Sequence, residues 1–123
     1  MKDMTDKDFI IGVVGAGAMG TGIAQVAVQN GIATIIYDAG DGAAIAAKAG
    51  IAQRLSRLVE KGKLPEAHRQ AAEARLKVAN NIEELAPCSV VIEAIIEDLD
   101  AKASVFCALE QIVSSDTILA TNT

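Results

Sequence analysis

The feature that most restricts the fold of this chain is a glycine-rich segment, GAGAMG, at residues 15–20. It directly follows an apolar run at residues 9–14 and opens a helical pattern at residues 20–30, so it lies between a strand and a helix. Three glycines at this spacing and in this context are typical of the phosphate-binding turn of a dinucleotide-binding βαβ unit. The alternative is a structural glycine turn that binds nothing. The segment predicts a diphosphate site made of Gly15, Ala16, Gly17, Ala18, Met19 and Gly20.

Each glycine of this segment has its own predicted role. Gly15 makes the tight turn, Gly17 lets the backbone approach the diphosphate, and Gly20 lets the helix pack closely on the strand. The free N–H groups and the positive end of the helix dipole would then face the anion.

An acidic residue, Asp38, ends the second apolar run, residues 33–37. A carboxylate about 20 residues beyond the glycine turn accepts hydrogen bonds from the adenosine ribose hydroxyls. It would also repel the 2′-phosphate of NADP, and no arginine stands at position 39 or 40 to offset this, so NAD is favoured over NADP. Two alternatives stay open: Asp38 can serve only to cap a turn, and FAD-binding domains usually carry an acidic residue here too.

The apolar periodicity predicts alternating strands and helices along the chain. Strands separated by helices imply parallel pairing with right-handed crossovers, so we expect an α/β fold with a Rossmann-type doubly wound parallel sheet. Such a sheet normally continues to a sixth strand, so we expect one truncated after its fifth strand, with a helical hairpin inserted after the second. The predicted strands are residues 9–14, 33–37, 76–79, 89–94 and 117–120, and the predicted helical segments are residues 20–30, 43–61, 65–74, 81–85 and 99–113.

The composition fits one folded domain and argues against several partners. Residues 1–8 are polar and are expected to form a flexible tail, with residues 9–123 forming the cofactor-binding domain. With 16 acidic against 11 basic residues and no basic stripe, the chain is not expected to bind nucleic acid. It shows no signal peptide and no apolar run of about 18 residues, so a cytoplasmic protein without membrane contact is expected.

The cysteines and the single histidine are predicted to be structural. Cys88 and Cys107 form no CxxC pair and lie in apolar surroundings, so we expect both to be reduced and buried, without a disulfide or a metal site. His68 lies in a charged segment without a partner constellation, which indicates a surface histidine rather than a catalytic one.

Further segments make the chain resemble the 3-hydroxyacyl-CoA dehydrogenase family. Residues 91–98, VIEAIIED, followed by Lys102, Phe106 and Leu109, are similar to the family's VIEAxxEDxxxKxxxFxxL pattern. Residues 120–123, ATNT, are similar to its (A)(S/T)NTS block, ending one residue before the serine. Residues 15–24 also resemble the opening of this family, although a methionine before the third glycine occurs in β-hydroxyacid dehydrogenases as well.

The resemblance implies an activity and a set of contacts. The parent protein would reversibly oxidise L-3-hydroxyacyl-CoA to 3-oxoacyl-CoA with NAD. Glu97 and Lys102 match residues that contact the cofactor and its nicotinamide-side ribose, and Asn122 ends the strand beside the nicotinamide pocket. Arg54 and Lys61, on the first helix of the hairpin, match positions that contact CoA, although the family often has a serine in place of Arg54.

The resemblance also implies what residues 1–123 leave out. The family's catalytic histidine, the glutamate that orients it, and a C-terminal helical domain that forms the homodimer interface would belong to sequence beyond Thr123. We therefore expect the chain to bind the cofactor without turning over substrate.

Less specific interpretations of the same residues remain. Glu97 and Asp98 precede a predicted helix, where acidic residues commonly cap, and Lys102 would otherwise be a solvated lysine. Arg54 and Lys61 lie seven residues apart, a spacing that is common on solvated helices. The alternative functions are a β-hydroxyacid dehydrogenase acting on a free acid and a non-catalytic, crystallin-like nucleotide-binding protein.

Overall fold

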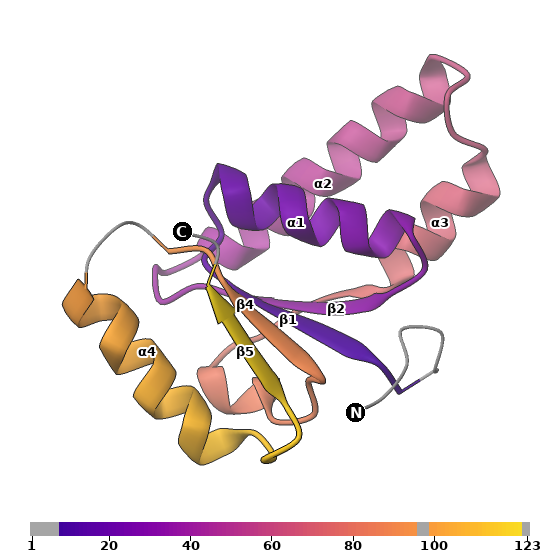
Figure 1. The fold of residues 1–123 in the computed structure, drawn as a ribbon. Helices are drawn as coiled ribbons and strands as arrows, with labels where there is room; N and C mark the ends of the chain where they lie inside the picture. Colours follow the sequence, from indigo (N-terminus) through magenta and orange to yellow (C-terminus); the bar gives the residue numbers. More distant parts are fainter. Residues whose placement is uncertain (1–7, 96–98, 122–123) are drawn as a thin grey trace.

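The computed structural model describes residues 8–95 and 99–121, which form a five-stranded parallel sheet with helices on both faces (Figure 1). The strand order is β3-β2-β1-β4-β5, so the chain starts in the middle of the sheet, fills one side and then fills the other. The elements are β1 (Ile10–Val14), α1 (Ala18–Gln29), β2 (Ala33–Tyr37), α2 (Ala43–Glu60), α3 (Glu66–Ala74), β3 (Leu76–Val78), η1 (Ile82–Leu85), β4 (Val90–Glu93), α4 (Leu99–Ile112) and β5 (Ile118–Thr121).

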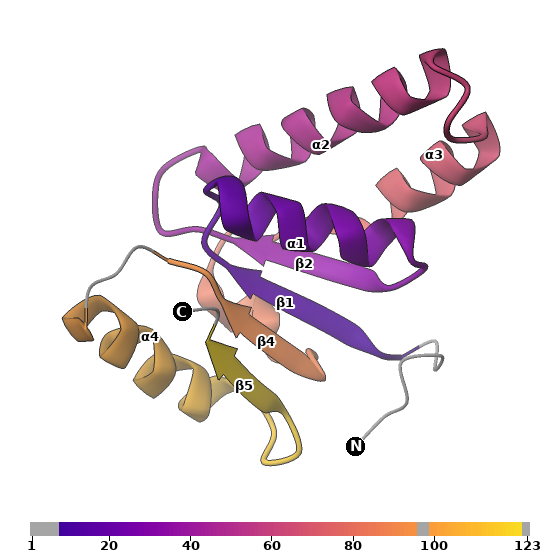
Figure 2. The same ribbon diagram turned by 45° about the horizontal axis from the view of Figure 1, so that its top comes forward.

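The helices divide between the two faces as right-handed crossovers require. α1, α2 and α3 lie on one face, and η1 and α4 lie on the other (Figures 1 and 2). Crossovers that travel toward β3 and those that travel toward β5 put their helices on opposite sides. The fold class predicted from the sequence is therefore confirmed, including the helical hairpin after the second strand.

Two apolar cores fill the space between the sheet and its helices. Side chains alternate along each strand, so Val13 and Ile36 join the cluster beneath α1 and α2. Their neighbours Val14 and Ile35 join the cluster beneath η1 and α4. Aromatic residues make up only 2% of the chain, and branched aliphatic side chains and alanine fill both cores.

The predicted segments are all present, and no end is displaced by more than two residues. The largest difference is at α1, which begins at Ala18, inside the glycine segment, rather than at residue 20. Gly17 is its N-cap and has an extended backbone, so the helix starts as soon as the turn closes. The predicted tail falls largely on residues 1–7, outside the described residues.

One prediction about the cysteines is wrong. Cys88 is buried, as expected, but Cys107 is exposed on α4. Lys102 and Leu109 are the buried residues on the sheet side of α4, and Cys107 precedes Leu109 by two residues, about 200° around the helix. Burial raises the pKa of the Cys88 thiol to about 12, which keeps it protonated and inert.

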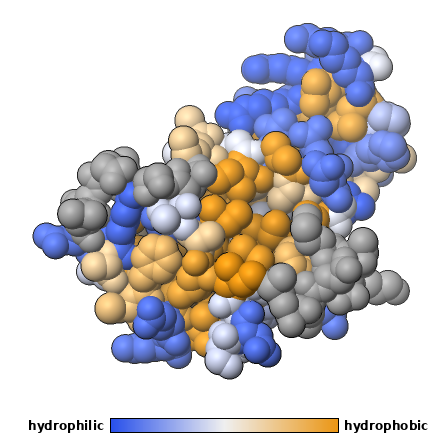
Figure 3. All heavy atoms as spheres, in the orientation of Figure 1, coloured by the Kyte–Doolittle hydropathy of each residue, from blue (hydrophilic) through white to orange (hydrophobic). Residues whose placement is uncertain are grey.

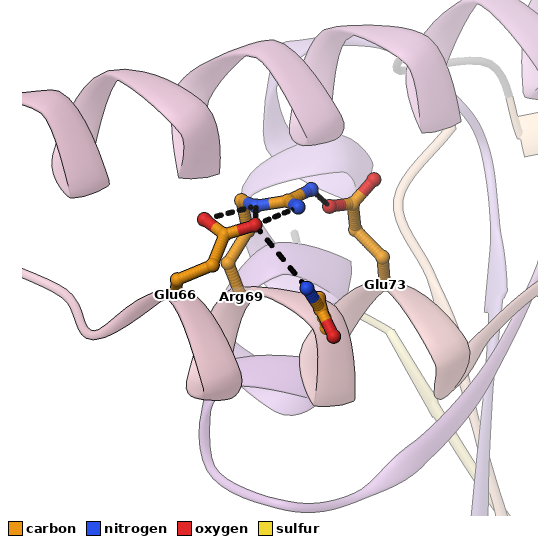
Figure 4. Close-up of polar contacts among 4 residues, drawn as sticks. Glu66, Arg69 and Glu73 are labelled. Atoms are coloured by element: carbon orange, nitrogen blue, oxygen red, sulfur yellow. Dashed lines mark hydrogen bonds and ion pairs between the residues drawn. The ribbon is translucent and has the colours of Figure 1, made fainter.

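The hairpin of α2 and α3 is held together at its base by apolar packing. Ile51 and Leu55 of α2 are buried in the same cluster as Ala72 of α3. On α3, Arg69 makes ion pairs with Glu66 and Glu73 (Figure 4). The hydrogen bonds from Arg69 hold the pKa of the Glu66 carboxyl below its usual value. Exposed ion pairs contribute little to folding, so the apolar base positions the hairpin.

One apolar face of the molecule stays open among the described residues. Figure 3 shows apolar side chains gathered where α1, β4 and β5 lie in Figure 1. Met19 and Val26 of α1 and Ile118 of β5 are exposed large hydrophobic residues. A shallow hollow of about 640 Å³ lies along α1 and is lined in part by Ile11 and Val26.

In the part of the chain that the structure describes, no helix is both long and apolar enough to cross a membrane.

Candidate dinucleotide-binding site

The predicted site residues gather at the carboxyl ends of the central strands. The glycine turn follows β1 and Asp38 follows β2. β4 ends beside them at Glu93, which was not among the predicted residues. β1 lies between β2 and β4, whose following helices cover opposite faces of the sheet. The crevice formed at such a switch point is where open α/β sheets bind their ligands.

Two of the three glycines are required by contacts within the protein. A Cβ at Gly20 would lie 1.8 Å from the carbonyl oxygen of Gly15. A Cβ at Gly15 would lie 2.7 Å from the carbonyl oxygen of Ala94, and its φ of +113° is one that other residues rarely adopt. These positions pack α1 and the start of the turn closely against the ends of β1 and β4.

The third glycine, Gly17, has no such requirement from the protein. A Cβ built there meets no atom of residues 8–95 and 99–121 within 4 Å, and its φ of −73° and ψ of −170° suit any residue. The space in front of Gly17 is therefore open, at the place where a diphosphate must approach the backbone closely.

The beginning of α1 is arranged to face an anion. Its N-cap residue is Gly17, which has no side chain that could accept hydrogen bonds from the first amides of the helix. The first turn of the helix holds no acidic residue. The first amides of an α-helix have no acceptor within the helix and carry the positive end of its dipole. The charge at this end of α1 is thus left for a negatively charged ligand.

Asp38 connects the glycine turn to the turn that follows β2. Its Oδ2 accepts a hydrogen bond of 2.7 Å from the amide of Ala16, and its Oδ1 accepts one of 2.7 Å from the amide of Gly40. The second bond has the form of the turn cap that the sequence left open as an alternative, and the first ties the carboxylate to the phosphate-binding turn as well. A carboxylate offers about four acceptor positions, so ribose hydroxyls can still be bound.

A pocket of about 250 Å³ lies directly beside this carboxylate. Its lining is mostly polar and comes from the turn after β2 and from the end of β3. Asp38, Gly40, Ile45, Val78 and Asn80 are among the lining residues.

A buried charged group at the ends of β4 and β5 was not predicted from the sequence. Glu93 is 0% exposed, and its carboxylate accepts hydrogen bonds from the Ile95 amide and the Thr121 hydroxyl, each 2.7 Å long. The ammonium of Lys102 lies 4.0 Å from Glu93 Oε1. The one signal in the sequence that could have revealed this group is a charged residue at the end of the apolar run of β4.

The structure brings some of the other predicted residues to this edge and leaves others apart. Lys102 is buried on α4 beside Glu93, so it is not a solvated surface lysine. Glu97 and Asn122 lie outside the described residues. Arg54 and Lys61 are exposed on the hairpin, where Arg54 donates a 3.3 Å hydrogen bond to Gln25 of α1.

No second reactive centre is found in the described residues. His68 is exposed on α3 and borders a small cavity with Gln29 and Arg75. Within residues 8–95 and 99–121, no cluster of three or more histidine, cysteine or acidic side chains could hold a metal ion.

Comparison with known proteins gives a consistent result. The family model described as the NAD-binding domain of 3-hydroxyacyl-CoA dehydrogenase matches residues 10–123. A probable 3-hydroxybutyryl-CoA dehydrogenase of Deinococcus radiodurans is 40% identical over 112 residues, which are 91% of this chain and 40% of that protein. The 3-hydroxyadipyl-CoA dehydrogenase of Escherichia coli is 37% identical over 92% of this chain and 24% of its own length.

Solved structures agree with the sequence matches. The crystal structure of (S)-3-hydroxybutyryl-CoA dehydrogenase from Ralstonia eutropha is similar with a TM-score of 0.88 and 38% identity, over 93% of this chain and 40% of that one. The chain therefore spans about two fifths of the length of such relatives.

Proposed function

Because the chain belongs to the 3-hydroxyacyl-CoA dehydrogenase family as its NAD-binding domain, we propose that it holds NAD in an enzyme that reversibly oxidises L-3-hydroxyacyl-CoA to 3-oxoacyl-CoA. The similar proteins from Deinococcus and Escherichia are named for CoA thioesters rather than free acids, which favours this substrate over a free β-hydroxyacid. A soluble, cytoplasmic homodimer formed through a C-terminal helical domain is part of the same proposal.

The observation that carries the proposal is the open space at Gly17. Packing against other described residues accounts for Gly15 and Gly20, whereas a side chain at Gly17 would meet no described atom within 4 Å. A diphosphate bound by residues 15–20 would account for it, because only glycine allows such a close approach. The uncapped start of α1 would supply the amides that bind the anion.

The other predicted residues would contact the remaining parts of the bound dinucleotide and the CoA substrate. Asp38 would accept hydrogen bonds from the adenosine ribose and discriminate against the 2′-phosphate of NADP. Lys102, together with Glu97 and Asn122, would face the nicotinamide side of the cofactor. Arg54 and Lys61 would meet the phosphates of CoA as positive charges on the exposed hairpin.

The reaction itself needs more than these residues. Bound NAD supplies the hydride acceptor, and a separate group must take the hydroxyl proton. The single histidine of the chain, His68, is exposed on α3, a poor place for that base. We therefore propose that residues 1–123 bind and orient NAD and that the base belongs to the rest of the enzyme.

Calorimetric titration of the chain with NADH and NADPH tests the site. NADH is expected to bind, and NADPH is expected to bind at least about tenfold more weakly because of Asp38. In Gly17→Val, the new side chain fills the space in front of the turn, so NADH binding should fall at least about tenfold. Valine is a poorer N-cap than glycine, so the unfolding midpoint should fall slightly, and the affinities are compared at a temperature where both proteins are folded.

Gly50→Ala is the matched control for the glycine substitution. Gly50 lies in α2, and a Cβ added there would also meet none of the described atoms within 4 Å, but it is remote from the turn in sequence and element. This variant should bind NADH as the wild type does. Equal affinity of Gly17→Val and wild type for NADH would contradict the proposed site.

A further inference from the structure

The carboxylate of Glu93 is a buried charge whose role the proposed function does not yet include. It is 0% exposed and has three partners among the described residues: the Ile95 amide, the Thr121 hydroxyl and the Lys102 ammonium. Lys102 is itself only 8% exposed, so the pair is largely removed from water.

Stability alone is a weak explanation for such a pair. Moving two charges out of water is unfavourable, and apolar residues of similar size often serve the fold as well or better. Removing only one partner is strongly destabilising, because it leaves the other charge uncompensated. A buried ion pair at the carboxyl edge of the sheet is therefore better explained by what it holds in place.

Glu93 is placed to join the parts of the site that come from different elements. The backbone that follows it packs on the glycine turn: the Ala94 amide donates a 2.8 Å hydrogen bond to Val14, and the Ala94 carbonyl lies where a side chain of Gly15 would be. Through Thr121, Glu93 fixes the end of β5, and through Lys102 it reaches the first half of α4.

We propose that Glu93 is a positioning residue for the nicotinamide half of the dinucleotide site. It holds the Lys102 ammonium and the end of β5 at a fixed position relative to the glycine turn, so that the cofactor's second ribose meets them correctly. This inference rests on the proposed function, in which Lys102 faces that ribose.

The variant Glu93→Gln isolates the charge. The glutamine oxygen can still accept from the Ile95 amide, and its NH₂ group can donate to the Thr121 hydroxyl oxygen, so both hydrogen bonds have replacements. The main change is at Lys102, whose ammonium loses the attraction of Oε1 and faces an NH₂ donor in its place. Glu110→Gln, the same change at an exposed position on α4, is the control.

The affinities for three ligands test the adenosine half and the nicotinamide half of the site independently. NADH and ADP-ribose contain the second ribose, whereas ADP contains only the adenosine half and the diphosphate. In Glu93→Gln, affinity for NADH and ADP-ribose should fall about three- to tenfold, while affinity for ADP changes less than about twofold. The ratio of NADH to ADP affinity is independent of how much protein is folded, because both ligands need the same fold.

Lys102→Gln and a double mutant complete the test. Lys102→Gln should reproduce the loss, and the double variant should bind NADH no more weakly than Lys102→Gln alone, because the two side chains act as one unit. Should Glu93→Gln fail to fold, Thr121→Val, which removes one hydrogen bond to Glu93, should still lower the NADH to ADP ratio.

The outcomes distinguish this inference from the proposed function. An unchanged NADH to ADP ratio in Glu93→Gln, or in Thr121→Val if that variant must replace it, would overturn the role of Glu93 while leaving NAD binding intact. Additive losses in the double variant would show that Glu93 does not act through Lys102 and would overturn it as well. A wild-type chain that binds no NADH would overturn both proposals.

Discussion

At the scale of single residues, Asp38 has two separate tasks in this fold. Its two oxygens bind amides of two different turns, Ala16 after β1 and Gly40 after β2. The carboxylate therefore holds these turns together before any ligand arrives. The same side chain, with its remaining acceptor positions, is the proposed partner of the adenosine ribose.

Asp38→Asn removes the charge and keeps one carbonyl acceptor, so the contact to one of the two turns is lost together with the charge. We expect the affinity for NADH to fall about tenfold, since hydrogen bonds to charged groups contribute about 1.5–3 kcal/mol. Affinity for NADPH should fall less or rise, because the repulsion of its 2′-phosphate is removed. Calorimetric titration with both cofactors measures the ratio, and an unchanged preference for NADH would contradict the role given to Asp38.

The sequence predicts some site residues better than others for a physical reason. The demands on Gly15, Gly20 and Asp38 are set by local turns and by fixed spacing within one βαβ unit. Glu93 meets Thr121 only because β4 pairs with β5, and it meets Lys102 only because α4 packs back on the sheet. Such partners are distant along the chain, so their meeting cannot be read from spacing.

At the scale of elements, the spacing of apolar residues was sufficient to predict the helices and strands of the described residues. It was not sufficient to predict which side of each helix is exposed. The ten segments were recognisable because the apolar residues keep a helical or strand period throughout. The predicted burial of Cys107 was wrong because apolar neighbours in the sequence do not show which side of a helix packs on the sheet. The packing of Leu109 fixes that rotation, and Cys107 then faces outward.

The α2–α3 hairpin gives a test of which contacts hold an element in place. Leu55 is 0% exposed in the hairpin's apolar base, so Leu55→Ala should lower the free energy of unfolding by about 2–5 kcal/mol. Leu58→Ala, at a partly buried position one turn away, should have a clearly smaller effect. Urea unfolding measures both, and equal effects of the two substitutions would show that the base is not the stabilising contact.

At the scale of the whole molecule, the order of the strands determines where the site can form. Because all the strands are parallel, the glycine turn and the ends of β2 and β4 lie at one edge of the sheet, and the reversal of strand order between β1 and β4 opens a crevice there. This arrangement follows from the handedness of the crossovers, which is why strand alternation in the sequence already predicted the fold class. The hollow along α1 could not be predicted in the same way, because it depends on which surfaces the helices leave uncovered.

For the molecule as a whole, we expect residues 1–123 to bind the cofactor and the rest of the enzyme to supply the catalytic base. Residues 1–123 should bind NADH but should not form it from NAD and 3-hydroxybutyryl-CoA, because hydride transfer requires a base for the hydroxyl proton. His68 is exposed on α3, so His68→Ala should leave NADH binding unchanged. The absorbance of NADH follows the reaction, with a full-length relative as the positive control. NADH formation by the wild-type chain would contradict this division, and its loss in His68→Ala would identify His68 as the base.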